Sequence, residues 1–146
     1  MASTAKTLTF VIPAYNMESY LDRCVNSLLS ASDISDLEVL IVDDGSLEYA
    51  RKLERTNPGA VRAIHQENKG HGGAVNTGIA AATGMYVKVV DADDWVDPQA
   101  IDTVLATLRA QHDTDEPIDM LVTNYVYDKV AKRHKTVVNF RRVMEA

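Results

Sequence analysis

Residues 86–94 read YVKVVDADD, an apolar run that ends in three acids within four residues. The run from Tyr86 to Val90 predicts a β-strand, and Asp91 begins the turn after it. Acids this close together repel one another in a half-buried turn, and a divalent cation relieves that repulsion. Mg²⁺ and Mn²⁺ prefer hard oxygen ligands, and Mg²⁺ is often held by one or two carboxylates together with substrate phosphates. Asp91 and Asp93, one residue apart, therefore suit a bridge between a metal and a diphosphate.

A second interpretation of the same acids needs no metal. Carboxylates at the start of a helix complement its dipole, and a helix is expected to follow, with Pro98 in its first turn. The turn from Asp91 to Asp94 could then serve only to begin the helix that runs to Ala110. The spacing of the acids alone does not separate the two interpretations.

The rest of the chain alternates strand patterns with helical patterns. Leu21, Cys24, Val25, Leu28 and Leu29 have the spacing of one helix face. Strands are predicted at Leu8–Ile12, where Pro13 stops the run, and at Leu37–Val42, Val61–His65 and Tyr86–Val90. Further helices are predicted at Glu48–Arg55, Ala74–Ala82 and Pro98–Ala110, and a hairpin at Met120–Tyr127 and Thr136–Phe140. The order predicts an α/β fold in one domain over residues 1–146, with a mostly parallel sheet covered by helices on both faces.

Polar residues follow three of the predicted strands at the point where each strand ends. Pro13 to Asn16 follow the first strand, Asp43 and Asp44 end the second, and Asp91 follows the fourth. In sheets of this class ligands bind at the carboxyl ends of the strands. Asp43 and Asp44 could accept hydrogen bonds from a nucleobase or ribose, or they could form only a turn in which Ser46 caps the next helix.

Four glycines, Gly70, Gly72, Gly73 and Gly78, lie between the third and fourth predicted strands. Glycine lets the backbone approach a ligand closely, but tight packing of a helix on the sheet explains the same cluster. The segment matches neither the Walker phosphate loop nor the dinucleotide motif. His65 and His71 lack a partner at zinc-ligand spacing.

Composition excludes several other classes of function. Fifteen basic and 21 acidic residues give a net charge of −6, which argues against nucleic-acid binding. The sequence has no apolar run of membrane-spanning length. Its single cysteine, Cys24, forms no internal disulfide and is expected to be buried, which is compatible with the reducing, cytoplasmic location that we expect.

Four segments in this order resemble the family 2 glycosyltransferases, which are inverting enzymes of the GT-A fold. They are Val11–Asn16 with Glu18, Ile41–Ser46, Asn68–Gly70 with Asn76–Ile79, and Gly84–Tyr86 leading to Asp91–Asp94. The resemblance covers residues 8 to 98. It implies a nucleotide-sugar donor, with UDP as the nucleotide, a Mn²⁺ or Mg²⁺ cofactor, and a glycan or lipid-linked acceptor in the synthesis of cell-surface polysaccharide. For the full-length protein it also implies a location at the cytoplasmic face of a membrane.

The resemblance also implies roles for individual residues. Tyr15 would stack on the nucleobase, Asp44 would hydrogen-bond it, and Asp91 and Asp93 would hold the metal. The expected donor-binding set is Pro13, Ala14, Tyr15, Asn16, Glu18, Asp43, Asp44, Gly70, Asn76, Asp91 and Ala92. Val75 stands where the family commonly has an arginine, and Lys69 or His71 would then supply the missing charge.

The catalytic base of the family has no convincing match in this sequence. Asp128 is a weak candidate, and the base is expected beyond Ala146, in a longer protein of which this chain is a part. The resemblance thus leaves two functions open, a glycosyltransferase domain and a nucleotide-sugar binding module that does not catalyse transfer. A phosphoacceptor domain is a third possibility, for which Lys88 and Thr123 are a poor match.

Overall fold

The computed structural model describes residues 5–45, 47–129 and 132–141, apart from the side chain of Leu47. These residues form two compact units that divide between His112 and Asp113. The first unit holds the strands and helices that carry all of the predicted donor-binding residues. The second unit holds a small hairpin.

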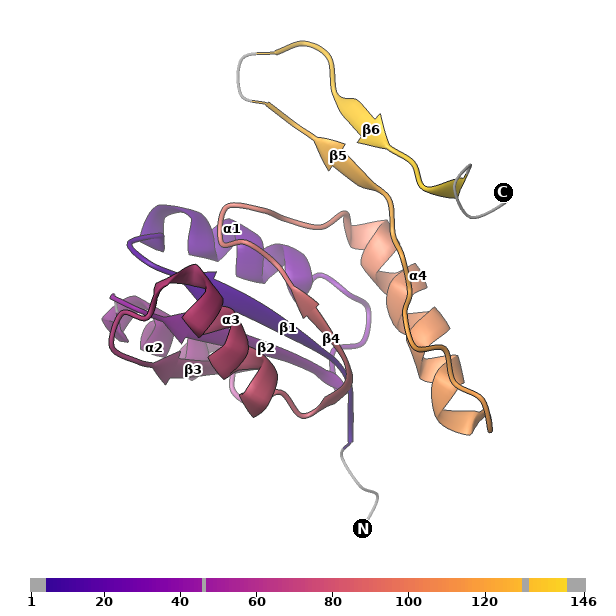
Figure 1. Cartoon of the computed structure of the whole chain (residues 1–146), viewed down its shortest axis with the longest axis horizontal. Helices are drawn as coiled ribbons and strands as arrows, with labels where there is room; N and C mark the ends of the chain where they lie inside the picture. The colour runs from indigo at the N-terminus through magenta and orange to yellow at the C-terminus, as the bar shows by residue number, and fades with distance from the viewer. Residues whose placement is uncertain (1–4, 46, 130–131, 142–146) are drawn as a thin grey trace. The chain divides into compact units, whose positions relative to one another are not determined.

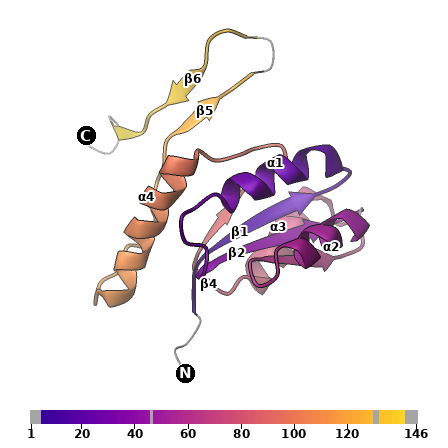
Figure 2. The ribbon, with the colours of Figure 1, turned by 180° about the vertical axis from the view of Figure 1, so that it is seen from behind.

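The first unit is built on a parallel sheet of four strands in the order β3-β2-β1-β4 (Figures 1 and 2). The strands are β1 (Lys6–Ala14), β2 (Leu37–Asp43), β3 (Val61–His65) and β4 (Gly84–Val89). Every neighbouring pair is parallel, so all four carboxyl ends lie at one edge of the sheet. The predicted fold class is confirmed. The polar residues that follow the predicted strands lie at this edge of the sheet.

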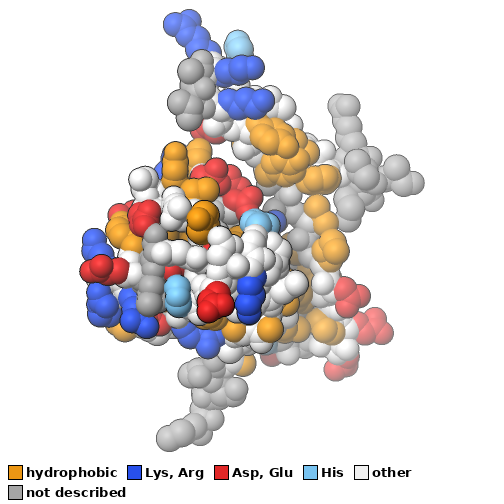
Figure 3. Space-filling view, turned by 60° about the vertical axis from the view of Figure 1, so that its left-hand side comes forward, with side chains coloured by type: hydrophobic (Ala, Val, Ile, Leu, Met, Phe, Trp, Pro, Cys, Tyr) orange, Lys and Arg blue, Asp and Glu red, His pale blue; other side chains and the backbone are white. Residues whose placement is uncertain are grey.

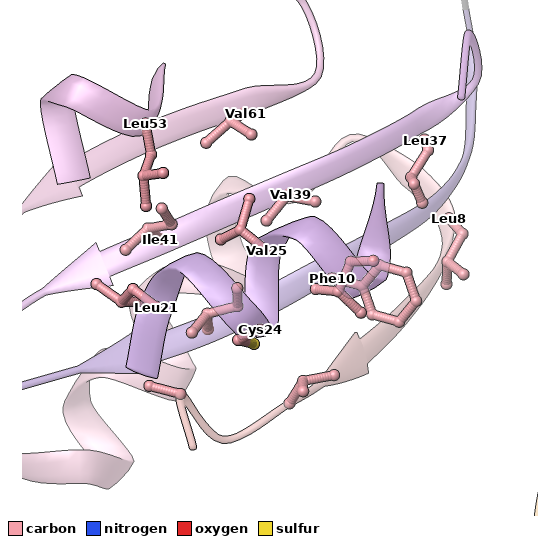
Figure 4. Packing of buried hydrophobic residues seen from close by; sticks show 14 of the residues in the cluster. Leu8, Phe10, Leu21, Cys24, Val25, Leu37, Val39, Ile41, Leu53 and Val61 are labelled. Atoms are coloured by element: carbon pink, nitrogen blue, oxygen red, sulfur yellow. The ribbon is translucent and has the colours of Figure 1, made fainter. Parts of the chain in front are cut away.

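Four α-helices cover the two faces of this sheet. They are α1 (Glu18–Leu28), α2 (Leu47–Thr56), α3 (Gly70–Ala81) and α4 (Pro98–Arg109), which a short 3₁₀ turn, Ala110–Asp113, follows. Buried side chains of α1, α2 and α4 share one core with β1 and β2, whereas Ala74 of α3 packs in a separate cluster with Val11, Leu40 and Val42. Figure 4 shows the larger core, where Cys24 and Val25 of α1 meet Phe10 and Val39 of the sheet.

The two central strands are buried on both faces. All seven residues of β2 are buried, and so are the residues of β1 from Thr7 to Ala14. Strands covered by helices on both sides are near-continuous apolar runs, which is the pattern of residues 10–12 and 39–42. Cys24 is completely buried, as its helical spacing predicted.

The end predicted for the first strand at Ile12 is wrong, because β1 continues through Pro13 to Ala14. Pro13 pairs with Val42 of β2, whereas the pairing of β1 with β4 stops at Val11. The strand therefore has only one neighbour where the proline lies. Proline is tolerated in a strand where its missing N–H faces no partner.

The third predicted helix begins earlier than expected, at Gly70 instead of Ala74. Gly70 has a φ of +74°, a conformation that glycine adopts without strain. Its backbone N–H donates to Oδ1 of Asn68 at 2.9 Å. This local turn starts α3 and draws Gly72 and Gly73 into the helix instead of into a loop.

The second unit contains the predicted hairpin in a shorter form, β5 (Tyr125–Tyr127) paired antiparallel with β6 (Thr136–Val138). The prediction of a strand from Met120 is wrong, because residues 120–123 lie outside the three pairings that β6 supplies. Asp128 pairs with Lys135 at 2.9 Å beside the hairpin. Lys and Arg side chains gather at one end of this unit (Figure 3). In the described parts of both units, no helix is long and apolar enough to cross a membrane.

Candidate donor-binding site

The loops that follow β1 and β2 lie against each other. The backbone N–H of Asp44 donates to the carbonyl oxygen of Ala14 at 3.0 Å, which joins the two strand ends. A Cβ atom on Gly45 would lie 3.1 Å from Cδ2 of Tyr15 and 3.4 Å from Oδ1 of Asn16. The Tyr15 ring therefore lies beside Gly45 while 55% of the residue stays exposed. An exposed ring at this edge presents a surface on which a planar base can stack.

The two acids at the end of β2 differ in what they contact. Asp43 is buried, its Oδ1 accepts from the backbone N–H of Gly45 at 3.2 Å, and its Oδ2 lies 3.6 Å from Nδ1 of His65. Asp44 is only 8% exposed, and its Oδ1 accepts from Nε2 of Gln66 at 2.6 Å. Asp43 is thus tied into the turn, whereas Asp44 carries a carboxylate held by a neighbouring side chain at the sheet edge. The proposed cap at Ser46 lies outside the described residues.

Gln66 and Thr77 belong to this edge, although sequence reasoning did not select either of them. Thr77 of α3 donates its hydroxyl to Oε1 of Gln66 at 2.5 Å. Gln66 directly follows β3, so the rule that ligand groups collect at strand ends would have marked it. Thr77 has no such signal, because its contact depends on how α3 packs on the sheet.

The acid turn after β4 is exposed except at its centre. Ala92 is buried and anchors the turn, while Asp91, Asp93 and Asp94 are exposed. The backbone N–H of Asp94 donates to the carbonyl oxygen of Asp91 at 2.9 Å. Partial burial raises the pKa of Asp94, and the charges of Asp93 and Asp91 raise it further. The acids therefore repel one another, as their sequence spacing predicted.

The acid turn does not begin the helix that follows it. The N-cap of α4 is Asp97, whose Oδ1 accepts from the backbone N–H groups of Gln99 and Ala100 at 2.9 and 3.0 Å. Pro98 stands in the first turn, as predicted. The interpretation of Asp91 to Asp94 as a cap of this helix is wrong, because Asp97 is the capping residue.

Two contacts join the acid turn to the helices beside it. Cys24 of α1 approaches the carbonyl oxygen of Asp91 at 3.7 Å, and burial, followed by the charges of the three acids, raises the pKa of the Cys24 thiol to about 12. Nε2 of His71, in the first turn of α3, lies 3.9 Å from Oδ1 of Asp91. The Arg23 guanidinium carbon lies 3.3 Å from the Trp95 ring centroid, a cation–π contact that occupies one face of that ring.

The donor chemistry of the acid turn fits a hard divalent cation. Asp91 and Asp93 offer exposed carboxylate oxygens, the kind of ligand that Mg²⁺ and Mn²⁺ prefer. Within the described residues, no three His, Cys, Asp or Glu side chains form a ready group that could hold a metal ion. A cation here would therefore need phosphate or water oxygens to complete its coordination.

The remaining predicted residues are spread around the same end of the unit. Pro13 and Ala14 are buried in the last part of β1, and Asn16 has a left-handed φ of 52° in the loop that follows. Glu18 begins α1, and Gly70 and Asn76 lie on α3; all three residues are exposed. Among the described residues, no hydrogen bond or ion pair joins Asn76 to Asp44 or to the acid turn.

Comparison with known proteins matches this arrangement to one family. The family model of glycosyl transferase family 2 matches residues 9–136, which run from within β1 to the first residue of β6. The chain belongs to glycosyl transferase family 2. The family 2 relatives include an uncharacterized glycosyltransferase of Nostoc, 40% identical over 106 residues, which cover 70% of this chain and 33% of that protein. A chondroitin synthase of Escherichia coli is 40% identical over 105 residues, or 70% of this chain and 15% of that enzyme.

Solved structures agree with the family 2 fold. The mannosyltransferase PcManGT of Pyrobaculum calidifontis, in complex with GDP-Man and Mn²⁺, matches with a TM-score of 0.60 and 27% identity over 70% of this chain and 31% of that one. TarS of S. aureus, in complex with UDP, matches with a TM-score of 0.63 and 24% identity over 73% of this chain and 33% of that one. The chain therefore spans a third or less of the length of these relatives and neighbours.

Proposed function

We propose that this family 2 domain binds the nucleoside diphosphate of a nucleotide-sugar at the carboxyl edge of its sheet. In the whole protein the bound sugar would pass to an acceptor hydroxyl with inversion. The observation that carries the proposal is the convergence of an exposed ring, Tyr15, with a held carboxylate, Asp44, at the ends of neighbouring strands β1 and β2. An acidic turn follows β4, the other neighbour of β1.

Each part of this edge suits one part of a nucleoside diphosphate. The Tyr15 ring offers a stacking surface for the base, and the Asp44 carboxylate offers an acceptor for an N–H of the base edge. Asp91 and Asp93 would hold a divalent cation together with the phosphate oxygens. When bound, that cation would stabilise the negative charge that develops on the leaving diphosphate. The complex of PcManGT with GDP-Man and Mn²⁺ supports a metal–nucleotide pair in this family.

His71 is the side chain that we propose for the diphosphate contact that Val75 does not provide. His71 lies at the start of α3 and beside Asp91, where an imidazole can donate to a phosphate oxygen. Lys69, the other residue considered, precedes α3 and is also exposed. Separate His71→Ala and Lys69→Ala substitutions, each titrated with nucleoside diphosphate, decide between them. Unchanged affinity rejects the substituted residue.

UDP is the nucleotide that we propose, because UDP donors are the most frequent in the family. The names of related proteins, such as the chondroitin synthase, favour a polysaccharide product, with a glycan or lipid-linked acceptor. The GDP-Man bound by PcManGT makes GDP the nucleotide to compare.

The test is thermal stabilisation by UDP, GDP and CDP, each with and without Mn²⁺. A ligand that binds only the folded state raises the melting temperature by an amount that grows with the logarithm of its concentration above the dissociation constant. We expect stabilisation by one nucleoside diphosphate that depends on Mn²⁺, and we expect Asp93→Asn to lose the Mn²⁺-dependent part. Stabilisation by none of the three would refute the proposal. A transfer assay with a sugar donor of the nucleotide that binds then separates a catalytic domain from a binding module.

A further inference from the structure

Gln66 connects the end of β2 to helix α3. Its backbone N–H donates to the carbonyl oxygen of Asp43 at 3.1 Å, which extends the β2–β3 ladder one residue beyond His65. Its side-chain amide makes two short hydrogen bonds. Nε2 of Gln66 donates to Oδ1 of Asp44 at 2.6 Å, and Oε1 of Gln66 accepts from the Thr77 hydroxyl at 2.5 Å. Both the backbone and the side chain of Gln66 are therefore held.

The carboxylate of Asp44 fixes which way the Gln66 amide faces. An ionised carboxylate only accepts hydrogen bonds, so the NH₂ group of the amide must point toward it. The carbonyl oxygen of the amide then points toward Thr77, whose hydroxyl can donate. A reversed amide would set two acceptor oxygens against each other. The three side chains thus form a chain of hydrogen bonds with one direction, from Thr77 through Gln66 to Asp44.

This chain acts on a carboxylate that is almost buried. Asp44 is 8% exposed, and among the described residues Gln66 is the side chain that hydrogen-bonds its carboxylate, at Oδ1. Oδ2 is the other oxygen of this carboxylate. A hydrogen bond to a charged group is stronger and more directional than one between neutral groups, so the Gln66 bond sets the rotamer of Asp44 and the direction in which Oδ2 points.

We propose that Gln66 and Thr77 are positioning residues that aim the Asp44 carboxylate at an imide N–H of the nucleobase. This inference rests on the proposed function and adds to it the residues that orient Asp44 for selection of the base. Uracil presents such a group at N3 and guanine at N1, whereas N3 of cytosine carries a lone pair. The site therefore favours uracil or guanine over cytosine, and the helix that carries His71 also supports recognition of the base.

Thr77→Val is the variant that isolates this role, because it removes the hydroxyl and keeps the shape of the side chain. Calorimetric titration in Mn²⁺ compares UDP with 3-methyl-UDP, and GDP with 1-methyl-GDP, in which a methyl group blocks the imide N–H. CDP completes the series. Thr77→Ser keeps the hydroxyl. Thr103→Val, on α4, is the matched control, because the Thr103 hydroxyl donates to the carbonyl oxygen of Gln99 in its own helix.

The unsubstituted chain is expected to bind the unblocked nucleotide more tightly than its methylated analogue and to bind CDP weakly. Thr77→Val should weaken binding of the unblocked nucleotide by about five- to tenfold, the effect of losing one directed hydrogen bond. Binding of the methylated analogue should not change, so the ratio of the affinity for the unblocked nucleotide to the affinity for its methylated analogue should fall. Thr77→Ser and Thr103→Val should keep the ratio. In an Asp44→Ala background, Thr77→Val should have no further effect.

Several results overturn the inference while leaving the proposed function intact. They are an equal loss of affinity for the blocked and unblocked nucleotides, a Thr77→Val effect that persists without Asp44, and a preference for CDP. Failure of the unsubstituted chain to bind any of the nucleotides refutes the proposed function itself. Gln66→Leu is a second variant for which the ratio of the two affinities, for the unblocked and the methylated nucleotide, can be measured. If Gln66→Leu does not fold, the Thr77→Val result alone tests the inference.

Discussion

Helix α3 packs on β1 so closely at Gly78 that an added Cβ atom would overlap Cγ1 of Val11. Val11 is completely buried in the centre of the sheet, with Leu40 and Val42 of β2 beside it. Its side chain cannot move aside without disturbing that cluster. Gly78 therefore sets the distance between the sheet and the helix that carries Thr77 and His71.

Gly78→Ala should destabilise the fold. Overpacking a filled core costs about 1–3 kcal/mol, and the gain in helix propensity offsets up to about 1 kcal/mol of that cost. Urea unfolding measures the difference. Gly72→Ala in the same helix is the control, because an added Cβ there meets no atom within 4 Å, and it should be neutral or stabilising. Equal effects of the two substitutions would show that the close approach is unimportant.

Asp97 and Asp93 should separate stability from metal-dependent binding. Asp97→Ala removes the N-cap of α4 and should lower the free energy of unfolding by about 1 kcal/mol. Asp97→Ser, which can still cap, should restore most of it. Asp93→Ala should leave stability near that of the unsubstituted chain and abolish the effect of Mn²⁺ on nucleotide binding. A stability loss at Asp93 as large as that at Asp97 would return the acid turn to a capping role.

The fold and the site edge could be predicted because they depend on local pattern. The spacing of Leu21, Cys24 and Val25 indicates a buried helix face, and acids that follow apolar runs mark the ends of parallel strands. Asp97 could also have been found, since it immediately precedes Pro98, and a proline in the first turn places the N-cap just before it.

Other features depend on partners that lie far away in the sequence. Pro13 lies within β1 because β4 stops pairing at Val11, a fact about the sheet and not about the residues near the proline. Thr77 meets Gln66 only because Gly78 lets α3 approach the sheet. The expected strand at Met120 failed for the same reason, since a strand needs hydrogen-bonding neighbours and β6 supplies only three pairings.

Asp36 should make stability depend on pH in the acid range. Hydrogen bonds from Arg109, the larger cause, and from Thr7 lower the pKa of Asp36 from 3.8 to about 2, against the effect of burial, which raises it. The folded state therefore binds this proton less tightly than the unfolded chain does. The stabilisation is complete above pH 4 and is lost as the pH falls toward 2.

Asp36→Asn should accordingly cost about 1 kcal/mol at pH 7, a value reduced because both partners are partly exposed to water. Urea unfolding at several pH values measures how the difference between the variant and the unsubstituted chain changes. The difference should shrink between pH 4 and pH 2 as Asp36 takes up its proton. A difference that stays constant over this range would mean that the ion pair does not contribute through the charge of Asp36.

Tyr15 should contribute to nucleotide affinity through its ring and not through its hydroxyl. The ring lies beside Gly45 and next to the turn that holds Asp44, and more than half of the residue is exposed. Stacking of a base on an aromatic ring is worth about 1–3 kcal/mol, so Tyr15→Ala should weaken binding of the preferred nucleoside diphosphate by about five- to 150-fold. Tyr15→Phe keeps the ring and should bind almost as well as the unsubstituted chain.

Calorimetric titration of both variants measures the two affinities, and the melting temperature of each without ligand shows whether the fold is intact. Loss of affinity in Tyr15→Phe as large as that in Tyr15→Ala would assign the contact to the hydroxyl, and unchanged affinity in Tyr15→Ala would remove Tyr15 from the site.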